Sequence, residues 1–246
     1  MHIPFLTAAL AAVALATAAS LPAHGSVIVE ASRVIYPASA KDVTLRVTNP
    51  DPAPALVQSW IGQRSDSTPD GADVPFALSP AVGRVDPNGS QSVRIVALAN
   101  DLPRDRETVF YVHVIGIPAK PADGSLNYVQ VALRNVIKLF YRPSELTGDA
   151  NKAHAALSWS VVGKGAHAAL QVRNDSPFHV SFANFAALRG GRTVKDVGGG
   201  MVAPFSTATF KTPEIAAQLG QHDVALQYGY VDDWGAIRDA PLMLSP

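Results

Sequence analysis

The residues best suited to acid–base or metal chemistry are seven histidines, and their spacing does not form a site. They lie at positions 2, 24, 113, 154, 167, 179 and 222. No two of them have the H-x-H or H-E-x-x-H spacing that gathers imidazoles around a metal ion. The chain has no cysteine, which excludes disulfides, thiolate catalysis and cysteine-ligated zinc. We therefore expect no metal and no cofactor.

Two further groups have side chains that could serve in catalysis. His113 lies between Val112 and Val114 in a β-prone run, where a structural histidine is the simpler interpretation. Asp232 and Asp233 form an adjacent carboxylate pair that could bind calcium or transfer protons, but the neighbouring Tyr230 and Trp234 favour a turn between two strands. There is no G-x-S-x-G elbow and no Walker loop. The sequence predicts that the protein is not an enzyme.

Charge excludes another class of function. The chain carries 20 Lys and Arg residues against 20 Asp and Glu residues, so its formal net charge is zero. Nucleic-acid binding proteins neutralise phosphates with a basic surface. We expect no nucleic-acid partner, and any charge-based function must be local.

The first 25 residues have the pattern of a signal peptide. An apolar run at 5–19 is followed by Leu21-Pro22 and by the small-residue sequence Ala23-His24-Gly25, which places cleavage before Ser26. The segment departs from the usual pattern because no Lys or Arg precedes the apolar run. That run is shorter than the roughly 20 strongly apolar residues of a membrane span. We expect export with cleavage and no membrane insertion.

The remaining chain has the periodicity of β-strands nearly throughout. Runs such as 43–48, 56–61, 93–98 and 109–117 alternate or concentrate β-branched residues between Pro, Asn and Gly turns. A polar stretch at 145–155 separates this series from a second one. We predict an all-β protein with two tandem β-sandwich domains, at 26–144 and 145–246. Residues 213–219 have helical character, and the three glycines at 198–200 are interpreted as a loop.

One predicted strand is longer than a sandwich needs. Residues 126–142 contain no Gly or Pro, and Val129, Val131 and Leu133 share one face of the run. These side chains either fill the core of their own domain or belong to an edge strand that pairs with another chain. Soluble proteins usually suppress a long apolar edge, so keeping one favours β-augmentation.

Several segments together carry a family resemblance. They are EASRVIY at 30–36, LPRDRETVFY at 102–111, Ile117-Pro118, NVIKLFYRP at 135–143 and YVDDWG at 230–235. Their combination and order resemble the periplasmic pilus-assembly chaperones of the chaperone–usher pathway. The resemblance extends over nearly all of the chain after residue 25.

The resemblance implies an L-shaped molecule of two immunoglobulin-like domains in the periplasm. By position, Arg33 and Lys138 match the two cations that anchor the terminal carboxylate of a pilus subunit. Val129, Val131 and Leu133 match the donor strand. Glu107, Arg142 and Asp233 match an ionic cluster between the domains, with Asp232 as a rival for Asp233. The implied partners are pilus subunits and an outer-membrane usher.

The sequence is also compatible with other functions. The protein could be an immunoglobulin-like component of a surface fibre, although the chain shows no N-terminal donor extension. It could also be an exported hydrolase that uses His113, Asp232 or Asp233. Whether the free protein covers its own edge by forming a dimer is open. Without the resemblance, Arg33 and Lys138 would be interpreted as ordinary solvated strand residues.

Overall fold

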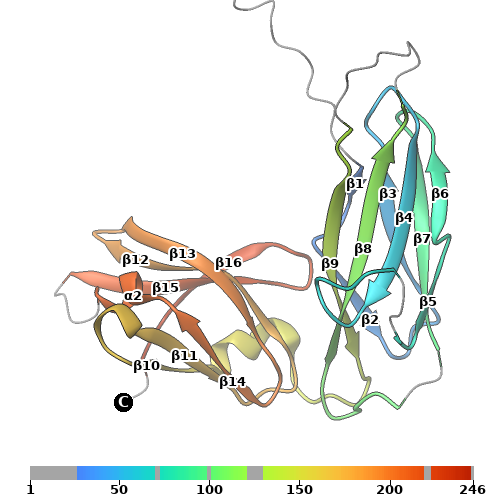
Figure 1. Ribbon diagram of the computed structural model, residues 1–246. Helices are drawn as coiled ribbons and strands as arrows, with labels where there is room; N and C mark the ends of the chain where they lie inside the picture. The colour runs from blue at the N-terminus through green and yellow to red at the C-terminus, as the bar shows by residue number, and fades with distance from the viewer. Residues whose placement is uncertain (1–26, 70–72, 99–100, 121–129, 219–222, 245–246) are drawn as a thin grey trace, which may run out of the picture.

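The protein folds into two β-sandwiches set at a large angle to each other, so that the molecule is L-shaped (Figure 1). This computed structural model describes residues 27–69, 73–98, 101–120, 130–218 and 223–244. The expected signal peptide and Val129 lie outside the described residues. The predicted all-β class with two tandem immunoglobulin-like sandwiches is confirmed.

The first sandwich contains one sheet with strand order β1-β3-β7-β5 and a second with order β2-β9-β8-β4-β6. Its strands are β1 Ile28–Val29, β2 Arg33–Pro37, β3 Val43–Thr48, β4 Ala55–Gly62, β5 Phe76–Ser79, β6 Val82–Val85, β7 Ser90–Ala97, β8 Thr108–Pro118 and β9 Leu133–Arg142. The alternating side chains of the two inner faces form a core that includes Leu45, Val93, Val112 and Leu139.

The second sandwich packs a sheet of order β10-β11-β14 on one of order β13-β12-β15-β16. Its elements are the 3-10 helices η1 Ala150–Ala156 and η2 Gly165–His167, the helix α2 Pro213–Ala216, and the strands β10 Ser158–Val162, β11 Ala169–Asn174, β12 Val180–Arg189, β13 Arg192–Val202, β14 Ser206–Lys211, β15 Val224–Val231 and β16 Ile237–Pro241. Trp159, Phe182, Phe185 and Tyr228 contact one another at its centre. No helix in the described ranges is long and apolar enough to cross a membrane.

Three details differ from the sequence-based expectation. Residues 27–37 form two strands in different sheets, because β1 pairs with β3 and β2 pairs with β9. Strand β6 was not predicted. The stretch expected as a polar linker contains η1, which buries Ala153 against the second sandwich.

The interpretation of Gly198–Gly200 as a loop is wrong. All three glycines belong to β13, which pairs with β12. A side chain at Gly199 would collide with the carbonyl oxygen of Phe182, and one at Gly200 would collide with the ring of Phe210. The glycines therefore allow backbone and aromatic rings to approach closely within a strand.

The strand predicted over residues 126–142 is observed as β9, from Leu133 to Arg142. Residues 130–132 are described but lie outside the strand. β8 pairs with β9 from Leu133 to Tyr141, whereas β2 pairs only with residues from Lys138 onward. The edge of β9 between Leu133 and Ile137 therefore has no strand partner among the described residues.

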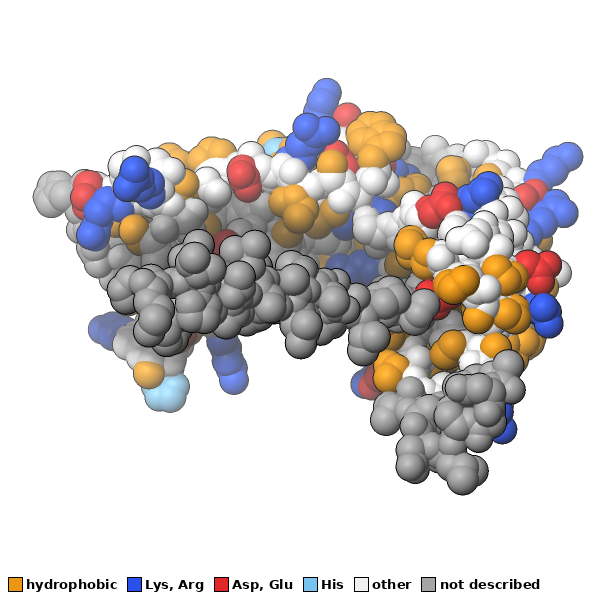
Figure 2. All heavy atoms as spheres, turned by 90° about the horizontal axis from the view of Figure 1, so that it is seen from above, with side chains coloured by type: hydrophobic (Ala, Val, Ile, Leu, Met, Phe, Trp, Pro, Cys, Tyr) orange, Lys and Arg blue, Asp and Glu red, His pale blue; other side chains and the backbone are white. Residues whose placement is uncertain are grey.

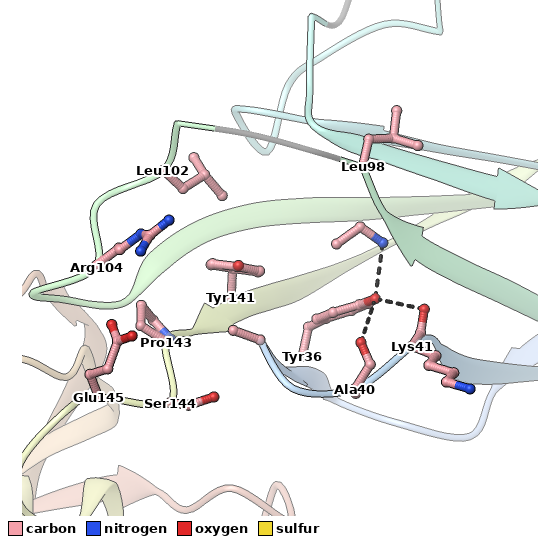
Figure 3. A pocket seen from close by; sticks show the side chains of 12 residues that line it. Tyr36, Ala40, Lys41, Leu98, Leu102, Arg104, Tyr141, Pro143, Ser144 and Glu145 are labelled. Atoms are coloured by element: carbon pink, nitrogen blue, oxygen red, sulfur yellow. Dashed lines mark hydrogen bonds between the residues drawn. The ribbon is translucent and has the colours of Figure 1, made fainter.

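A cavity of about 580 Å³ opens at the end of the first sandwich nearest the linker, between β2, the end of β7 and residues 143–145 (Figure 3). Tyr36 forms part of its wall. The Tyr36 hydroxyl accepts a hydrogen bond from Ala97 N at 2.9 Å and lies 3.2 and 3.1 Å from the carbonyl oxygens of Ala40 and Lys41, to which it donates. This one buried hydroxyl therefore connects the β2–β3 turn to β7.

Replacing Tyr36 with phenylalanine tests that connection. Tyr36→Phe leaves the half-buried amide of Ala97 without its partner, so the free energy of unfolding should fall by about 0.5–1.5 kcal/mol. Tyr141→Phe is the matched control, because Tyr141 lines the same cavity and its hydroxyl makes no hydrogen bond in the described structure. Chemical denaturation measures the free energy of unfolding of both variants. If Tyr36→Phe loses no more than Tyr141→Phe, the hydrogen bonds of the Tyr36 hydroxyl do not stabilise the fold.

Candidate functional site

The two predicted anchor cations lie side by side between the sandwiches. β2 and β9 run parallel, and their register places Arg33 directly opposite Lys138. Both side chains are half-buried. Lys or Arg side chains are visible in the hollow between the two sandwiches (Figure 2). The structure thus brings together the two residues that the family resemblance paired.

Arg33 is oriented by the second sandwich but keeps a polar atom without a partner. Its Nη1 donates to the carbonyl oxygen of Val231 at 2.9 Å, and its guanidinium lies 5.7 Å from the ring centre of Phe140. Its Nε is buried and makes no hydrogen bond within the described structure. Burial lowers the pKa of Arg33, and the charges of Asp233, Asp232 and Glu107 offset part of that effect.

Lys138 also reaches across to the second sandwich. Its Nζ donates to the hydroxyl of Ser181 at 3.2 Å. Burial lowers the pKa of Lys138, and the positive charge of Arg33 lowers it further. Neither cation forms an ion pair with a described residue. An anionic group bound between these two adjacent, partly desolvated cations would stabilise both of them.

The three residues of the predicted ionic cluster do meet. Arg142 at the end of β9 donates from Nε to Glu107 at 2.6 Å, and from Nη1 and Nη2 to the two oxygens of Asp233 at 2.7 and 2.9 Å. Burial alone would lower the pKa of Arg142, but its hydrogen bonds to Asp233 and the charge of Glu107 outweigh that effect and raise the pKa. Since Asp233 belongs to the second sandwich, these bonds cross between the two halves of the molecule.

His179 is a member of this cluster that the sequence analysis missed. Its backbone N–H donates to Glu107 Oε2 at 2.8 Å, and its ring Nδ1 lies 3.3 Å from the same oxygen. Glu107 is 3% exposed, and its own backbone N–H donates to Pro177 O. No pattern around His179 marks this role, because the partner carboxylate is 72 residues away in the chain. Glu107 of the first sandwich thus binds His179 of the second, and Asp233 of the second sandwich binds Arg142 of the first.

Asp232 has a different role from its neighbour. Its Oδ1 accepts hydrogen bonds from the backbone of Trp234 and Ala236, and its Oδ2 accepts one from Arg238. Desolvation would raise the pKa of Asp232, but these bonds outweigh it and lower that pKa. Asp232 shapes the turn between β15 and β16, and Asp233 is the residue that binds Arg142.

The predicted donor residues are exposed where the structure describes them. Val131 is 58% exposed and Leu133 is 54% exposed, whereas Val129 lies outside the described residues. Leu133 shares the strand face of Ile137 and Leu139, which are buried in the first sandwich. On this face Asn135 separates exposed Leu133 from the buried residues, and Val131 lies just before the strand, so exposed apolar side chains lie at the start of β9 beside its unpaired edge.

The catalytic and metal candidates are not brought together. His113 is fully buried, stacks on Trp60 at 4.9 Å between ring centres, and has Nε2 3.2 Å from Arg64 O. In the described ranges, no three His, Asp or Glu residues are placed to hold a metal ion. His113 is buried within the first sandwich, away from the adjacent Asp232 and Asp233, which line a small pocket between the sandwiches.

Two tandem immunoglobulin-like sandwiches, with Arg33 and Lys138 side by side between them, define the class of protein to which the chain belongs. The family model described as "Pili and flagellar-assembly chaperone, PapD N-terminal domain" matches residues 26–147. The model described as "Pili assembly chaperone PapD, C-terminal domain" matches residues 152–241. The chain belongs to the pilus assembly chaperone family.

Named relatives and solved structures agree with this assignment. The chain is 35% identical over 218 residues to the probable fimbrial chaperone YadV of Escherichia coli K12, which covers 86% of this chain and 87% of the relative. It is 33% identical over 237 residues to the chaperone FimB/FhaD of Bordetella pertussis, covering 94% and 92%. It resembles the crystal structure of the Pseudomonas aeruginosa CupB2 chaperone, with 35% identity, a TM-score of 0.69 and coverage of 88% and 100%.

A further solved structure contains a partner. The Salmonella enterica SafB chaperone in complex with the SafA pilin matches with 28% identity and a TM-score of 0.72, covering 91% of this chain and 99% of that one. That structure shows a chaperone of this fold holding a pilin.

The buried histidines predict a pH dependence of stability. Burial lowers the pKa of His113 and of His154 in the folded protein. The unfolded chain, with histidine pKa near 6.5, binds more protons than the folded one just below that pH. The free energy of unfolding should therefore be highest above about pH 6.5 and fall as the pH is lowered. The contribution of the two histidines should be lost once the pH is below their pKa values in the folded protein.

Variants separate the contribution of His113. His113→Phe keeps a ring against Trp60 and should flatten part of this decline, whereas the exposed His167→Asn should leave it unchanged. Urea denaturation at a series of pH values gives the profiles. Parallel profiles for wild type and His113→Phe would show that His113 does not titrate differently on unfolding.

The ionic cluster predicts a second stability effect. Glu107→Gln keeps the shape of the side chain but removes the charge that Arg142 Nε binds, while Arg142 retains Asp233. We expect a loss of about 1–3 kcal/mol in the free energy of unfolding. Asp105→Asn is the control, because the pair between Asp105 and Arg106 is exposed and should contribute little to stability. Similar small losses in both variants would contradict the assignment.

Proposed function

We propose that this protein binds pilus subunits in the periplasm by lending them β9, protects them from aggregation and delivers them to an outer-membrane usher. The observation that carries the proposal is the structure of β9. Leu133 at its start and Val131 just before it are exposed, and its unpaired edge from Leu133 to Ile137 leads to Lys138, which lies opposite Arg33 of β2. Open edge, apolar side chains and the two cations therefore lie next to one another along β9 and its neighbour β2.

Strand donation would supply most of the binding energy. An incomplete client sheet offers an unpaired edge and an open core groove, and β-augmentation fills both, with chaperone and pilin as the usual example. Each backbone hydrogen bond to the open edge of β9 contributes about 0.5–1.5 kcal/mol net. Each apolar side chain contributes about 1.5–3 kcal/mol when fully buried. Val131 and Leu133 are the described residues available for this, and we include Val129 from its position in the same alternation.

The two cations would fix the alignment of the client. A terminal carboxylate placed between them gives the orphaned Nε of Arg33 and the free N–H groups of Lys138 a charged acceptor. Charge-assisted hydrogen bonds of this kind contribute about 1.5–3 kcal/mol each. A slip of one residue would turn the apolar side chains of the client strand away from the groove. The anchor thus selects one register among several that burial alone would tolerate.

The remaining parts of the proposal concern the frame of the molecule. The cluster of Glu107, Arg142, Asp233 and His179 holds the two domains, which we place at 26–144 and 145–246, at the angle that keeps the cleft open. We further propose that residues 1–25 are removed on export, that the protein has no catalytic activity, and that free chaperone covers its open edge by forming a dimer. Family membership favours a chaperone over a fibre component.

Removal of either anchor charge tests the function. Arg33→Ala and Lys138→Ala should each reduce the amount of pilin-like subunit that co-purifies from a periplasmic extract by about 10-fold or more, since each removes one charge-assisted contact. Both proteins should remain folded, because neither cation pairs with a carboxylate in the described structure. Mass spectrometry identifies and quantifies the captured subunits.

Lys195→Ala provides the control, since Lys195 is an exposed lysine in a strand of the second sandwich. It should capture subunits as the wild type does. If folded Arg33→Ala and Lys138→Ala proteins also capture subunits at the wild-type level, the anchor assignment is wrong.

A further inference from the structure

Trp234 is an aromatic side chain held in an exposed position beside the cleft. It is 82% exposed, at the tip of the turn between β15 and β16. Among the described residues, Phe205 is the other aromatic side chain that is mainly exposed, and the guanidinium of Arg106 lies over its ring at 5.4 Å. No comparable contact covers the indole of Trp234 in the described structure.

The turn that carries Trp234 is firmly built. Asp232 O accepts from Gly235 N at 3.0 Å, and Asp232 N donates to Ala236 O at 3.0 Å. The Asp232 carboxylate accepts from Trp234 N at 3.1 Å and from Ala236 N at 2.9 Å. The backbone around the indole is therefore fixed before any partner arrives, which reduces the conformational entropy lost on binding.

The same turn is joined directly to the anchor. Val231 O accepts the hydrogen bond from Arg33, and Asp233 binds Arg142. Gly235 has a φ of +86° and lies so close to Ser32 that any side chain at this position would collide with the Ser32 hydroxyl. Ser32 immediately precedes Arg33. The hairpin reaches from the second sandwich toward the first at this point (Figure 1).

We propose that Trp234 is a contact of the second domain with the bound client, packing on the client strand next to its anchored carboxylate. The inference rests on the proposed function, because it takes the occupant of the Arg33–Lys138 site as given. Rigid, exposed tryptophans at the centre of an interface are frequent hot spots. Here the turn that carries the indole contacts Arg33 through Val231 and approaches Ser32, the residue before Arg33, through Gly235, so the strand held by that anchor is the partner that we assign to it.

The chain allows a direct optical test. Of its three tryptophans, Trp159 is buried, Trp60 is half-buried and stacked on His113, and Trp234 is exposed. The probe is a synthetic β-strand peptide about as long as β9, with alternating valine and threonine and a free terminal carboxylate. Acrylamide quenching of the wild type, compared with Trp234→Phe, isolates the signal of Trp234.

We expect bound peptide to protect the Trp234 signal from acrylamide. Trp234→Ala should weaken peptide binding about 10-fold without lowering the unfolding temperature, and Trp234→Phe should weaken it less than about 3-fold. Met243→Ala, another exposed apolar residue of the second sandwich, should bind as the wild type does.

Two outcomes overturn the inference, and they differ in what else they overturn. If the peptide binds in a Lys138-dependent way while Trp234 stays open to acrylamide, Trp234 belongs to another interface and the proposed function stands. If the peptide does not bind, or if its amide-terminated form binds equally well, the carboxylate anchor fails and this inference fails with it.

Discussion

The arrangement of the whole molecule depends on the register of β9. Leu133 at its start is exposed, Lys138 near its middle faces Arg33, and Arg142 at its end binds Glu107 and Asp233. Because a strand rises about 3.3 Å per residue, these positions are fixed distances apart on one rigid element. Leu133, Lys138 and the interdomain cluster around Arg142 therefore cannot move independently, and in the proposed function a client aligned by Lys138 is also aligned with Leu133.

The two groups of charges in the cleft obey opposite requirements. Arg142 donates to three acceptor oxygens. Asp233 supplies both oxygens of its carboxylate, and Glu107 supplies one. Arg33 and Lys138 have only a carbonyl and a hydroxyl as partners. Arg142 and its carboxylate partners hold the two sandwiches in a fixed geometry. Arg33 and Lys138 have no carboxylate partner among the described residues, and this favours binding of an anion. The neighbouring Glu107 and Asp233 act on Arg33 only at longer range, because their short contacts go to Arg142 and His179.

Much of this could be predicted from the sequence because its signals are local. Alternation in residues 43–48 and 109–117 gave the strands β3 and β8, and prolines marked their ends. The neighbouring positions of Arg33 and Lys138 came from a family resemblance, since no local rule pairs residues so far apart. The glycines at 198–200 were misplaced because glycine usually signals a turn, and only the packing of Phe182 and Phe210 shows why a strand needs them.

His179 shows where such prediction ends. Its backbone N–H and ring both meet Glu107, a carboxylate from the other sandwich, and neither contact leaves a trace in the residues around either partner. Interdomain contacts depend on the angle between two independently folded units, and that angle is set by the contacts themselves together with the linker. Pro177 O, Ser181 Oγ and Val231 O also accept hydrogen bonds from the first sandwich. These acceptors are distributed over two strands and a loop of the second sandwich, so the cleft exists only when both sandwiches have folded. The arrangement of Arg33 and Lys138 is therefore a property of the assembled molecule, although both cations belong to the first sandwich.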